Sequence, residues 1–560
     1  MNLVWAVSFV ISLIFVAFGQ NAWLGWLGPV AATAGYAIFW RGMLDWPTSA
    51  QRFVYSLIWF SSAHAFQLSW MSSTEYMGPL ILVVYVFLLI ALGVQFGLLS
   101  LFVGSSQPLT IRRCAALSGI WVMMEWVRLL FLTGFTWNPA GLALTTTLYS
   151  LQSASLFGIY GLSFWVIFVN LLALRASRAR SRSAIVAFAA CALLPFVFGA
   201  VRTSMAPKGD TKTISALLVQ TDLLPQQRDY DSHWPDAFIY PFDQWDRILG
   251  LMDTVKTGPI DLIVFPEGAL PYDAYHCVYP LLEMQKTWMQ HYGAASQKEL
   301  PPLGRPSRKP LSHLVQHEEG INWNVSNAYW VQALANHYQC EVIVGMDDRD
   351  LVSRKHYNAA FHFLPRRNTA ERTEKRILVP VGEYVPLKEW RLFSEFLARQ
   401  FGIGESFESG NEAKVFLGQI PIGVSICYEE TYSELIRELR VLGAQMFVNI
   451  SNDVWFPHSR LAMQHFNHGL VRAVENGVPL IRACNTGITG GVDCWGRTIA
   501  TEPECQPLAA MIRVPMRTLS TLYSFWGDGA ILFLSALFAL SSFFSDRNKK
   551  RPLPEIKKVD

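Results

Sequence analysis

A cysteine, a glutamate and a lysine stand at the ends of predicted strands or in adjoining loops, and together they could transfer an acyl group. Cys427 follows the strand-like run 423–426 in GVSICYEETYSE, Glu267 closes a strand in VFPEGALP, and Lys375 lies in EKRILVPVGEYVP. A thiol can attack an acyl carbonyl, a carboxylate can take and return its proton, and an ammonium can hold the resulting oxyanion. The three residue types predict acyl transfer through a thioester.

The surroundings of Cys427 predict a reactive thiol. Glu429, Glu430 and Glu434 open a predicted helix directly after the cysteine. Backbone N–H groups and the positive end of the helix dipole favour a thiolate at such a junction. A lone cysteine in a strand is more often a buried structural residue, and the accompanying glutamate and lysine are what favour a nucleophile here.

Glu267 and Lys375 each have a predicted supporting position. Glu267 follows the apolar strand LIVF and would lie at the carboxyl end of that strand, where α/β sheets place their sites. Glu383, in the loop VPVGEYVP, could pair with Lys375 and keep it charged and aimed. A single Glu or Lys is usually a solvated surface residue, so only the combination indicates a site.

The composition indicates a membrane protein. Of 560 residues only 16% are charged, 13% are aromatic, and the mean hydropathy is positive. A soluble protein would carry closer to a quarter charged residues, so part of the chain must lie in lipid. The net charge of +3, without a basic stripe, argues against nucleic acid as a partner. The eight cysteines have no zinc-type spacing, although some could pair in an oxidising compartment: Cys277, Cys340, Cys484, Cys494 and Cys505.

Apolar stretches of about 20 residues, the length that crosses a bilayer as a helix, fill the first part of the chain. The sequence predicts seven of them before residue 202 and an eighth near the end: 3–19, 22–40, 53–70, 78–104, 114–133, 157–174, 184–201 and 529–545. The first lacks a basic start and leads directly into the second, so it is interpreted as retained rather than cleaved.

Arginines in alternate connections predict the orientation. The connections 71–77 and 134–156 contain no Lys or Arg, whereas the second, fourth and sixth connections carry Arg41, Arg52, Arg112, Arg113, Arg175, Arg178, Arg180 and Arg182. By the positive-inside rule the arginine-bearing connections are cytoplasmic. The predicted domains are therefore seven membrane helices over 1–201, an extracytoplasmic catalytic domain over 202–527, an eighth helix over 528–546, and a basic cytoplasmic tail over 547–560.

One predicted membrane helix carries two charges. Glu125 and Arg128 in EWVRLLFLTGFTW are three residues apart, so they can lie on one helical face and neutralise each other. An ion pair that holds helices together and a contact with a lipid headgroup are both consistent with this spacing.

The second half alternates strands with helices. Apolar strands are predicted at ISALLVQ, DLIVFPE, CEVIVGM, NAAFHFL, FLGQIPIGVSICY, QMFVNISND and PLIRACN, with helices near 431–442 and 462–475. This pattern predicts a layered α/β domain of roughly 300 residues. The polar segment 273–327 shows no strong periodicity and is interpreted as a surface insertion.

Three histidines close together could suggest a metal. His458, His465 and His468 have neither an HExxH pattern nor cysteine ligands nearby. Core or helix-surface positions are therefore favoured over metal binding, and no metal or cofactor is predicted.

The arrangement of these motifs resembles the apolipoprotein N-acyltransferase family of the nitrilase superfamily. The resemblance extends along most of the chain, through EWVR and GFTW, LFGIYGLSF, FPEGALP, LVPVGEYVP, SICYEE, SNDVWF, QHFNHGLVRAVENGVPLIRACNTGI and TLYSFWGD. It implies a nitrilase-like αββα sandwich on a bundle of eight transmembrane helices. It also implies a monomer in the bacterial inner membrane, with its catalytic domain in the periplasm.

The resemblance implies a specific reaction and specific supporting residues. An acyl chain passes from a phospholipid, typically phosphatidylethanolamine, to Cys427 and then to the α-amine of a diacylglyceryl-cysteine apolipoprotein. Tyr428 and Glu429 would support the nucleophile, although Glu429 is also consistent with a simple helix cap. Trp455 could line the acyl pocket or belong to the core, and Arg128 could contact a headgroup.

Two other functions use the same features. A membrane-tethered nitrilase-type amidase would need the same three residues but has no need of the membrane helices. A non-catalytic lipid-binding or transport protein would need the helices but not the three residues, and the sequence has no paired inverted repeats with interrupted helices.

Overall fold

The structure is a computed structural model that divides into two compact units. It describes residues 3–44, 46, 48–104, 108–207, 209, 211–228, 237–255, 258–304, 310–317, 320–350, 353–367, 369–401 and 406–549. The first unit comprises Met1–Ser72, Leu82–Ala206 and Phe525–Asp560, and the second comprises Ser73–Ile81 and Pro207–Ser524. Most of the predicted basic tail, residues 550–560, lies outside the described residues.

The first unit is built from helices joined by short connections. Its helices are α1 (Leu3–Phe18), α2 (Gly28–Val30), α3 (Tyr36–Met43), α4 (Ser49–Gln67), α5 (Ile81–Phe102), α6 (Ile111–Val127), α7 (Leu148–Leu151), α8 (Ala154–Ala179), α9 (Arg182–Ser204) and α17 (Leu522–Lys549).

Four helices among the described residues are long and apolar enough to cross a membrane. They are α5, α8, α9 and the Leu522–Ser541 part of α17, and a shorter apolar helix covers Trp5–Phe18. The other stretches that the sequence predicts as spans are helical as well, since α4 and α6 cover most of 53–70 and 114–133. They are not among the four helices above, because α6 has only 17 residues and the sequence of α4 includes several polar side chains.

The predicted second span contains an irregular helical turn that a buried asparagine stabilises. Ala31–Gly35 forms a π-helix between α2 and α3. A π-turn shifts the backbone hydrogen bonds and leaves groups that need other partners. Asn170, fully buried on α8, supplies them, since its Nδ2 donates to the carbonyl of Ala32 at 2.8 Å and its Oδ1 accepts from Ala37 N at 3.0 Å.

Glu125 and Arg128 are both buried, but no ion pair joins them among the described contacts. Glu125 Oε1 accepts from Trp121 Nε1 and from the backbone N–H of Ala140, each at 2.8 Å. Arg128 Nε donates to Gln95 Oε1 at 2.8 Å. Hydrogen bonds to neutral partners therefore join α6 to α5 and to the segment that follows α6.

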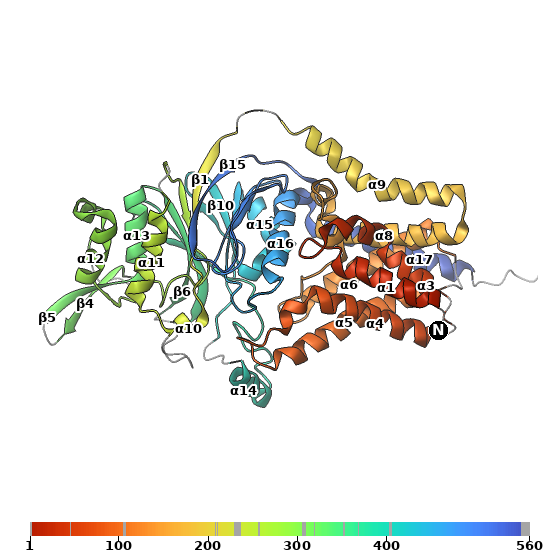
Figure 1. Cartoon of the computed structure of the whole chain (residues 1–560), viewed down its shortest axis with the longest axis horizontal. Coiled ribbons are helices and arrows are strands. Elements are labelled where there is room, and N and C mark those ends of the chain that lie inside the picture. The colour runs from red at the N-terminus through yellow and green to blue at the C-terminus, as the bar shows by residue number, and fades with distance from the viewer. Residues whose placement is uncertain are drawn as a thin grey trace, which may run out of the picture. The chain divides into compact units, whose positions relative to one another are not determined.

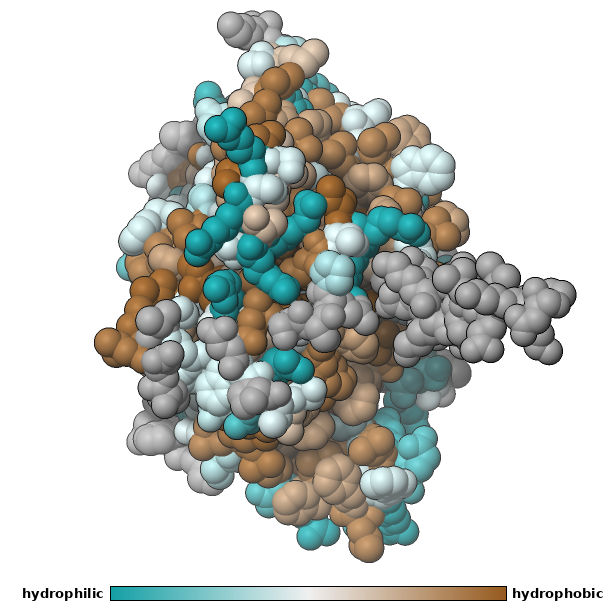
Figure 2. Space-filling model, turned by 90° about the vertical axis from the view of Figure 1, so that its right-hand side faces the viewer, coloured by the Kyte–Doolittle hydropathy of each residue, from teal (hydrophilic) through white to brown (hydrophobic). Residues whose placement is uncertain are grey.

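Exposed arginines mark the connection between α8 and α9. Arg178, Arg180 and Arg182 are all exposed there. Figure 2 views the molecule from the end where α8 joins α9 and shows hydrophilic groups gathered among hydrophobic ones. Basic groups beside apolar helix surfaces are typical of the ends of membrane helices.

The second unit contains two six-stranded sheets. One has the order β15-β1-β2-β6-β7-β8 and the other β14-β13-β12-β11-β10-β9. The strands of the first sheet are β1 (Thr213–Gln220), β2 (Leu262–Val264), β6 (Glu341–Arg349), β7 (His356–Phe363), β8 (Glu371–Glu374) and β15 (Leu508–Pro515). Those of the second are β9 (Val415–Leu417), β10 (Pro421–Ile426), β11 (Met446–Ser451), β12 (Leu480–Cys484), β13 (Gly490–Val492) and β14 (Thr498–Thr501).

The two sheets pack face to face, with helices on their outer faces. Apolar side chains of both sheets form one buried cluster, which includes Leu218 and Val264 from one sheet and Val424 and Ile450 from the other. In Figure 1, α11 (Pro241–Asp253) and α13 (Asn327–Tyr338) cover the first sheet, while α15 (Ser433–Val441) and α16 (Leu461–Asn476) cover the second. The predicted αββα sandwich is confirmed.

The segment 273–327 is more regular than its sequence suggests. It forms α12 (Leu281–Tyr292) and a small sheet of β3 (Tyr279–Pro280), β5 (Gly320–Val325) and β4 (Ser312–His317). Met284 and Trp288 of α12 are fully buried in the same cluster as α11 and α13. This segment therefore has regular structure of its own, and two buried side chains spaced four residues apart anchor its helix to the domain.

The remaining elements of the second unit are α10 (Pro225–Arg228) and α14 (Arg391–Gln400). All eight cysteines are free thiols, so the suggested disulfides among Cys277, Cys340, Cys484, Cys494 and Cys505 are absent.

Candidate active site

Glu267 lies just beyond the carboxyl end of β2, and the neighbouring strand holds its backbone. The N–H of Phe265 donates to the carbonyl of Ile343 on β6 at 2.8 Å. At Gly345 on β6, an added Cβ would meet the Cα of Glu267 at 2.7 Å. Only glycine permits that approach, so the sequence of β6 brings Glu267 against the sheet edge.

Lys375 follows β8 and is buried between two carboxylates. Its Nζ donates to Glu267 Oε1 at 3.0 Å and to Glu383 Oε1 at 2.7 Å, and its side chain is 1% exposed. Burial alone would lower the pKa of Lys375, but Glu267, Glu383 and Cys427 outweigh it and raise the pKa well above its ordinary value. Lys375 is therefore a permanent cation, as its predicted role requires.

Asn358 on β7 completes this group and has no counterpart in the sequence predictions. Its Nδ2 donates to Glu267 Oε1 at 2.6 Å and to Glu383 Oε1 at 3.0 Å. The backbone N–H of Lys375 also donates to the carbonyl of Asn358 at 2.8 Å. The described contacts engage only Oε1 of Glu267, so Oε2 is the oxygen left to accept a proton.

Cys427 lies directly after β10, and its backbone has a conformation that residues other than glycine rarely adopt. Its φ is +53°, and it starts a 3-10 helix over Cys427–Thr431. Left-handed backbone at a non-glycine residue costs about 1–2 kcal/mol and must be held by the surroundings. This strained turn places the partly exposed residue Cys427 directly at the end of the strand.

The thiol is electrostatically coupled to Glu267 and Lys375, but its resting state differs from the predicted one. Burial and then Glu267 raise the pKa of Cys427 well above its ordinary value, and Lys375 only partly opposes this rise. The expected thiolate at a helix N-terminus is therefore wrong, because α15 starts only at Ser433 and more carboxylates than cations surround the sulfur. A protonated thiol needs a base during attack.

Glu429 joins the cysteine turn to the lysine loop. Its carboxylate accepts from the backbone N–H groups of Arg376 at 2.5 Å, Ile377 at 3.2 Å and Ile426 at 2.8 Å. Glu429 therefore caps the 3-10 helix over Cys427–Thr431, because it accepts from the N–H of Ile426 at the start of that helix, and it also holds the lysine loop. Tyr428 is buried and packs edge-on against Tyr432, with ring centroids 5.1 Å apart.

Trp455 borders an apolar pocket instead of joining the core. It is 45% exposed and lines a pocket of ≈ 360 Å³ with Leu223, Pro225, Phe238, Pro241, Pro271, Tyr272, Asn452 and Val454. Its lining includes the loop after β2, which also carries Glu267, and the loop after β11, the strand beside β10. The interpretation of Trp455 as a core residue is wrong, whereas a role at a pocket remains open to test.

The three histidines occupy different environments. His465 and His468 on α16 are buried, and His458 is exposed. His465 Nε2 lies 3.0 Å from the carbonyl oxygen of Cys427, and its Nδ1 lies 2.9 Å from Asp453 Oδ1. Sequence reasoning finds no role for this histidine near the cysteine, because the two residues are 38 positions apart.

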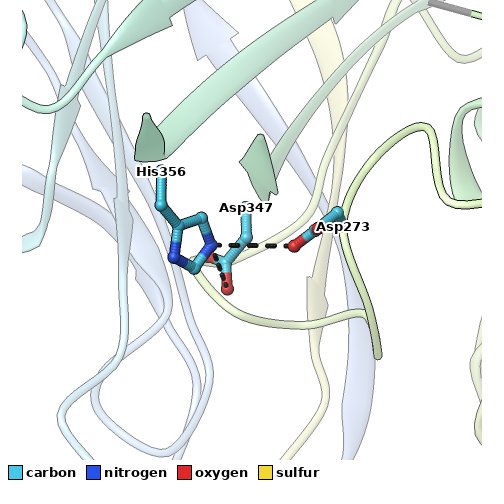
Figure 3. A group of neighbouring side chains, drawn as sticks. All are labelled: Asp273, Asp347 and His356. Atoms are coloured by element: carbon cyan, nitrogen blue, oxygen red, sulfur yellow. Dashed lines mark ion pairs between the residues drawn. The ribbon is translucent and has the colours of Figure 1, made fainter. Parts of the chain in front are cut away.

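Another group of side chains has the spacing of a metal site. Asp273, Asp347 and His356 offer ligand atoms within 4.8 Å of one another, and it is the one such group among the described residues. Figure 3 shows the imidazole facing both carboxylates, at 3.6 Å from Asp273 and 3.8 Å from Asp347. Contact with Asp273 raises the pKa of His356, and Arg349 Nε lies 3.6 Å from the same carboxylate, so ion pairs already engage this group. It includes none of the predicted catalytic residues.

Comparisons with known proteins agree with this geometry. The family of carbon-nitrogen hydrolases matches residues 240–521, and the N-terminal domain of apolipoprotein N-acyltransferases matches residues 9–172. An apolipoprotein N-acyltransferase of Chlamydia pneumoniae is 30% identical over 556 residues, which cover 94% of this chain and 95% of the relative. The chain belongs to the apolipoprotein N-acyltransferase family.

Other apolipoprotein N-acyltransferases align with the chain in the same way. That of Chlamydia caviae is 29% identical over 95% of this chain and 96% of its own length, and that of Geobacter metallireducens is 27% identical over 73% and 70%. Among solved structures, a carbon-nitrogen hydrolase from Helicobacter pylori covers 61% of this chain and all of its own, with 13% identity and a TM-score of 0.34. The family assignment rests on the sequence relatives, which align over the helical unit and the sandwich together.

Proposed function

We propose that this apolipoprotein N-acyltransferase moves an acyl chain from a phospholipid to Cys427 and then to the α-amine of a diacylglyceryl-cysteine apolipoprotein. The observation that carries the proposal is the meeting of a thiol from the second sheet with a carboxylate that has one uncommitted oxygen and a buried ammonium, both from the first sheet. The family relationship along the whole chain supports the choice of substrates. We assign the catalytic roles to Glu267, Lys375 and Cys427.

In the first half-reaction the phospholipid ester is cleaved. Glu267 takes the proton of the Cys427 thiol, and the sulfur attacks the ester carbonyl carbon. Lys375 holds the negative charge that develops on the carbonyl oxygen. The intermediate collapses with cleavage of the ester C–O bond, Glu267 returns the proton to the departing oxygen, and a lysophospholipid leaves the acyl chain on Cys427 as a thioester.

In the second half-reaction the amine of the apolipoprotein attacks the thioester carbonyl. Glu267 takes a proton from the amine nitrogen, the C–S bond breaks, and the proton returns to the Cys427 sulfur. The product is an amide, and the enzyme regains its starting state. Glu383 and Asn358 keep Lys375 and Glu267 in place through both steps, and Glu429 and Tyr428 support the cysteine turn.

The membrane arrangement is part of the proposal. We place eight helices across the bacterial inner membrane and the sandwich in the periplasm, where lipoprotein acceptors and outer-leaflet phospholipids meet. The arginine-bearing connections support this orientation. The chain acts as a monomer in this proposal, because one sandwich already carries every residue that the two half-reactions use. The apolar pocket at Trp455 is proposed as an acyl contact and Arg128 as a headgroup contact.

Mass spectrometry of the purified full-length enzyme tests the mechanism. Incubation with phosphatidylethanolamine should add the mass of one acyl chain to Cys427, and a diacylated lipopeptide should remove it. Cys427→Ala should give no adduct. Cys277→Ala, at a half-buried cysteine of the β3–β5 region, is the matched control and should behave like the unmodified enzyme.

Two outcomes would contradict the proposal. An acyl adduct on another residue would move the nucleophile elsewhere. Release of free fatty acid at the same rate with and without the lipopeptide would indicate a hydrolase, the second activity that the same three residues could support.

A further inference from the structure

Helix α14 has an apolar face that its own domain leaves uncovered. Its apolar residues fall at positions i, i+1, i+4 and i+5, which share one face of a helix: Leu392, Phe393, Phe396 and Leu397. Leu397 is the one buried residue of α14, and the other three are 86%, 43% and 47% exposed, in chain order. In Figure 1 the helix stands apart from both sheets of its unit. The exposed face therefore needs an occupant from outside the sandwich.

The residues around this face are those of a helix that lies in a membrane surface. Trp390, directly before the helix, is 68% exposed. On the polar face Arg391 pairs with Glu395 at 2.8 Å, and Arg399 is exposed in the last turn. Phenylalanine and leucine on one face with arginine on the other are typical of interfacial helices, and tryptophan is enriched at the level of the lipid headgroups.

The last residue of α14 contacts the segment that leads into a membrane helix. A Cβ added at Gly78 would lie 3.8 Å from the carbonyl oxygen of Gln400, and both residues belong to the second unit. Gly78 stands shortly before Ile81, where α5 begins, and the three residues between these points span at most about 11 Å. The end of α14 is thus held close to the place where the chain enters a helix long and apolar enough to cross a membrane.

This connection favours a phospholipid bilayer over a protein as the occupant. An apolar face that is joined to the start of α5 through Gly78 meets the same surface that α5 enters. The charges around α14 nearly cancel, so they do not call for a strongly charged partner: Lys388, Arg391, Arg399, Glu389 and Glu395. Because the membrane helices tether α14 at the bilayer, even a modest apolar contact suffices to hold it there.

The segment that carries α14 starts and ends beside the candidate active site. The N–H of Phe407 donates to the carbonyl of Glu383 at 2.9 Å, so the chain that leaves Glu383 toward α14 returns to the same residue. The carboxylate of Glu383 in turn accepts from Lys375 Nζ at 2.7 Å. A surface that holds α14 is therefore joined through a short stretch of chain to the residue that positions the lysine.

We propose that α14 is a bilayer-docking helix, which inserts Leu392, Phe393 and Phe396 among the phospholipid acyl chains. Docking keeps the loop of Glu383 at the lipid surface. The inference rests on the proposed function only in its consequence for the acyl donor. A donor that lies in a bilayer gains from a docked α14, whereas a donor dissolved in water does not.

Photo-cross-linking tests the docking directly. The full-length enzyme is placed in nanodiscs of phosphatidylethanolamine and phosphatidylglycerol that also contain phosphatidylcholine with a diazirine in its acyl chain. After illumination, mass spectrometry should find lipid adducts on residues 390–396. In the double variant Leu392→Gln, Phe396→Gln these adducts should fall by about tenfold, because the apolar contact loses two of its side chains.

Two matched variants separate docking from exposure alone. Arg391→Gln changes the polar face of the same helix, at a side chain that is 87% exposed, and should leave the adducts unchanged. Ile321→Gln alters an apolar residue that is 68% exposed on β5, and it should leave them unchanged as well. Adducts on the Ile321 peptide equal to those on α14 would overturn the proposal. So would an absence of adducts on α14, which would leave a protein as the occupant.

The second test compares two donors. Acylation of Cys427 is followed with phosphatidylethanolamine in nanodiscs and, in detergent, with dihexanoyl phosphatidylethanolamine, which dissolves in water. In the double variant the ratio of the bilayer rate to the dissolved rate should fall by about tenfold. Equal losses with both donors would mean that α14 supports the active site itself, and an unchanged ratio would mean that it does not serve the bilayer donor. Either result would overturn the proposal. Cross-linking needs no acyl transfer, so failure of the proposed function is distinguishable from failure of docking.

Discussion

Two buried charged clusters lie near Cys427, one coupled to its thiol and the other reaching its backbone carbonyl. The lysine cluster, Lys375 with Glu267 and Glu383, has one more carboxylate than cation and is coupled to the thiol. The arginine cluster, Arg482 with Glu430, Asp453 and His465, places one arginine between two carboxylates and reaches the carbonyl of Cys427 through His465. One cluster faces the reacting sulfur, and the other holds the turn that presents it.

The difference follows from what each cluster must do. A proton acceptor next to a thiol needs an excess of negative charge, and that excess also raises the pKa of the thiol. A cluster that only fixes the backbone is most stable when its charges cancel, because unpaired buried charge is costly. We therefore expect substitutions in the lysine cluster to change chemistry first and those in the arginine cluster to change stability first.

Arg482→Met gives the largest expected effect and tests the arginine cluster. It leaves Glu430 and Asp453 buried without their main cation, so the free energy of unfolding should fall by about 3–5 kcal/mol. Thermal unfolding of the full chain in detergent, with and without the substitution, measures this. Arg497→Met removes an arginine that is 46% exposed, at 3.9 Å from Asp493, and should cost less than about 1 kcal/mol. Equal losses in the two variants would mean that the buried Arg482 contributes no more to stability than an exposed arginine.

Lys375→Met tests the lysine cluster. Loss of the oxyanion-binding ammonium should lower the acylation rate of Cys427 by about 100- to 1000-fold. The rate is measured by mass spectrometry of the acyl adduct over time. Lys298→Met, at an exposed lysine, is the control and should leave the rate unchanged. A Lys375→Met enzyme that still acylates at the original rate would remove Lys375 from the mechanism.

Glu429→Gln tests the link between the clusters. The amide keeps one acceptor oxygen but turns an N–H donor toward backbone N–H groups that now have no acceptor. The free energy of unfolding should fall by about 1–3 kcal/mol, the cost of an unsatisfied buried group. Acylation should slow as well, because Arg376 and Ile377 directly follow Lys375 and their backbone helps to hold it in place. A loss of stability without any loss of rate would show that the lysine loop is held by other contacts.

The sequence predicts the three catalytic types because each stands beside a recognisable motif, but it does not predict how they are held. Asn358 lies in the strand-like run NAAFHF, where nothing distinguishes a polar side chain that faces the site from one that faces solvent. His465 and Asp453 meet Cys427 only through the packing of α16 on the second sheet. The thiol pKa is the clearest miss, since it depends on how many carboxylates converge and not on the local helix start.

Glu267→Gln tests the lysine cluster through the pKa of Cys427, the smallest of the expected shifts. Glu267 raises the pKa of Cys427, so removal of its charge should lower that pKa and move iodoacetamide labelling of Cys427 to lower pH by about one unit. Acyl transfer should nevertheless be lost, because no base remains to take the thiol proton. Glu283→Gln on α12, at an exposed glutamate, should change neither measurement. If Cys427 labels faster at neutral pH but no longer accepts an acyl chain, the electrostatic effect of Glu267 on the thiol is separate from its role as a base. An unchanged labelling curve would mean that Glu267 does not act on the sulfur.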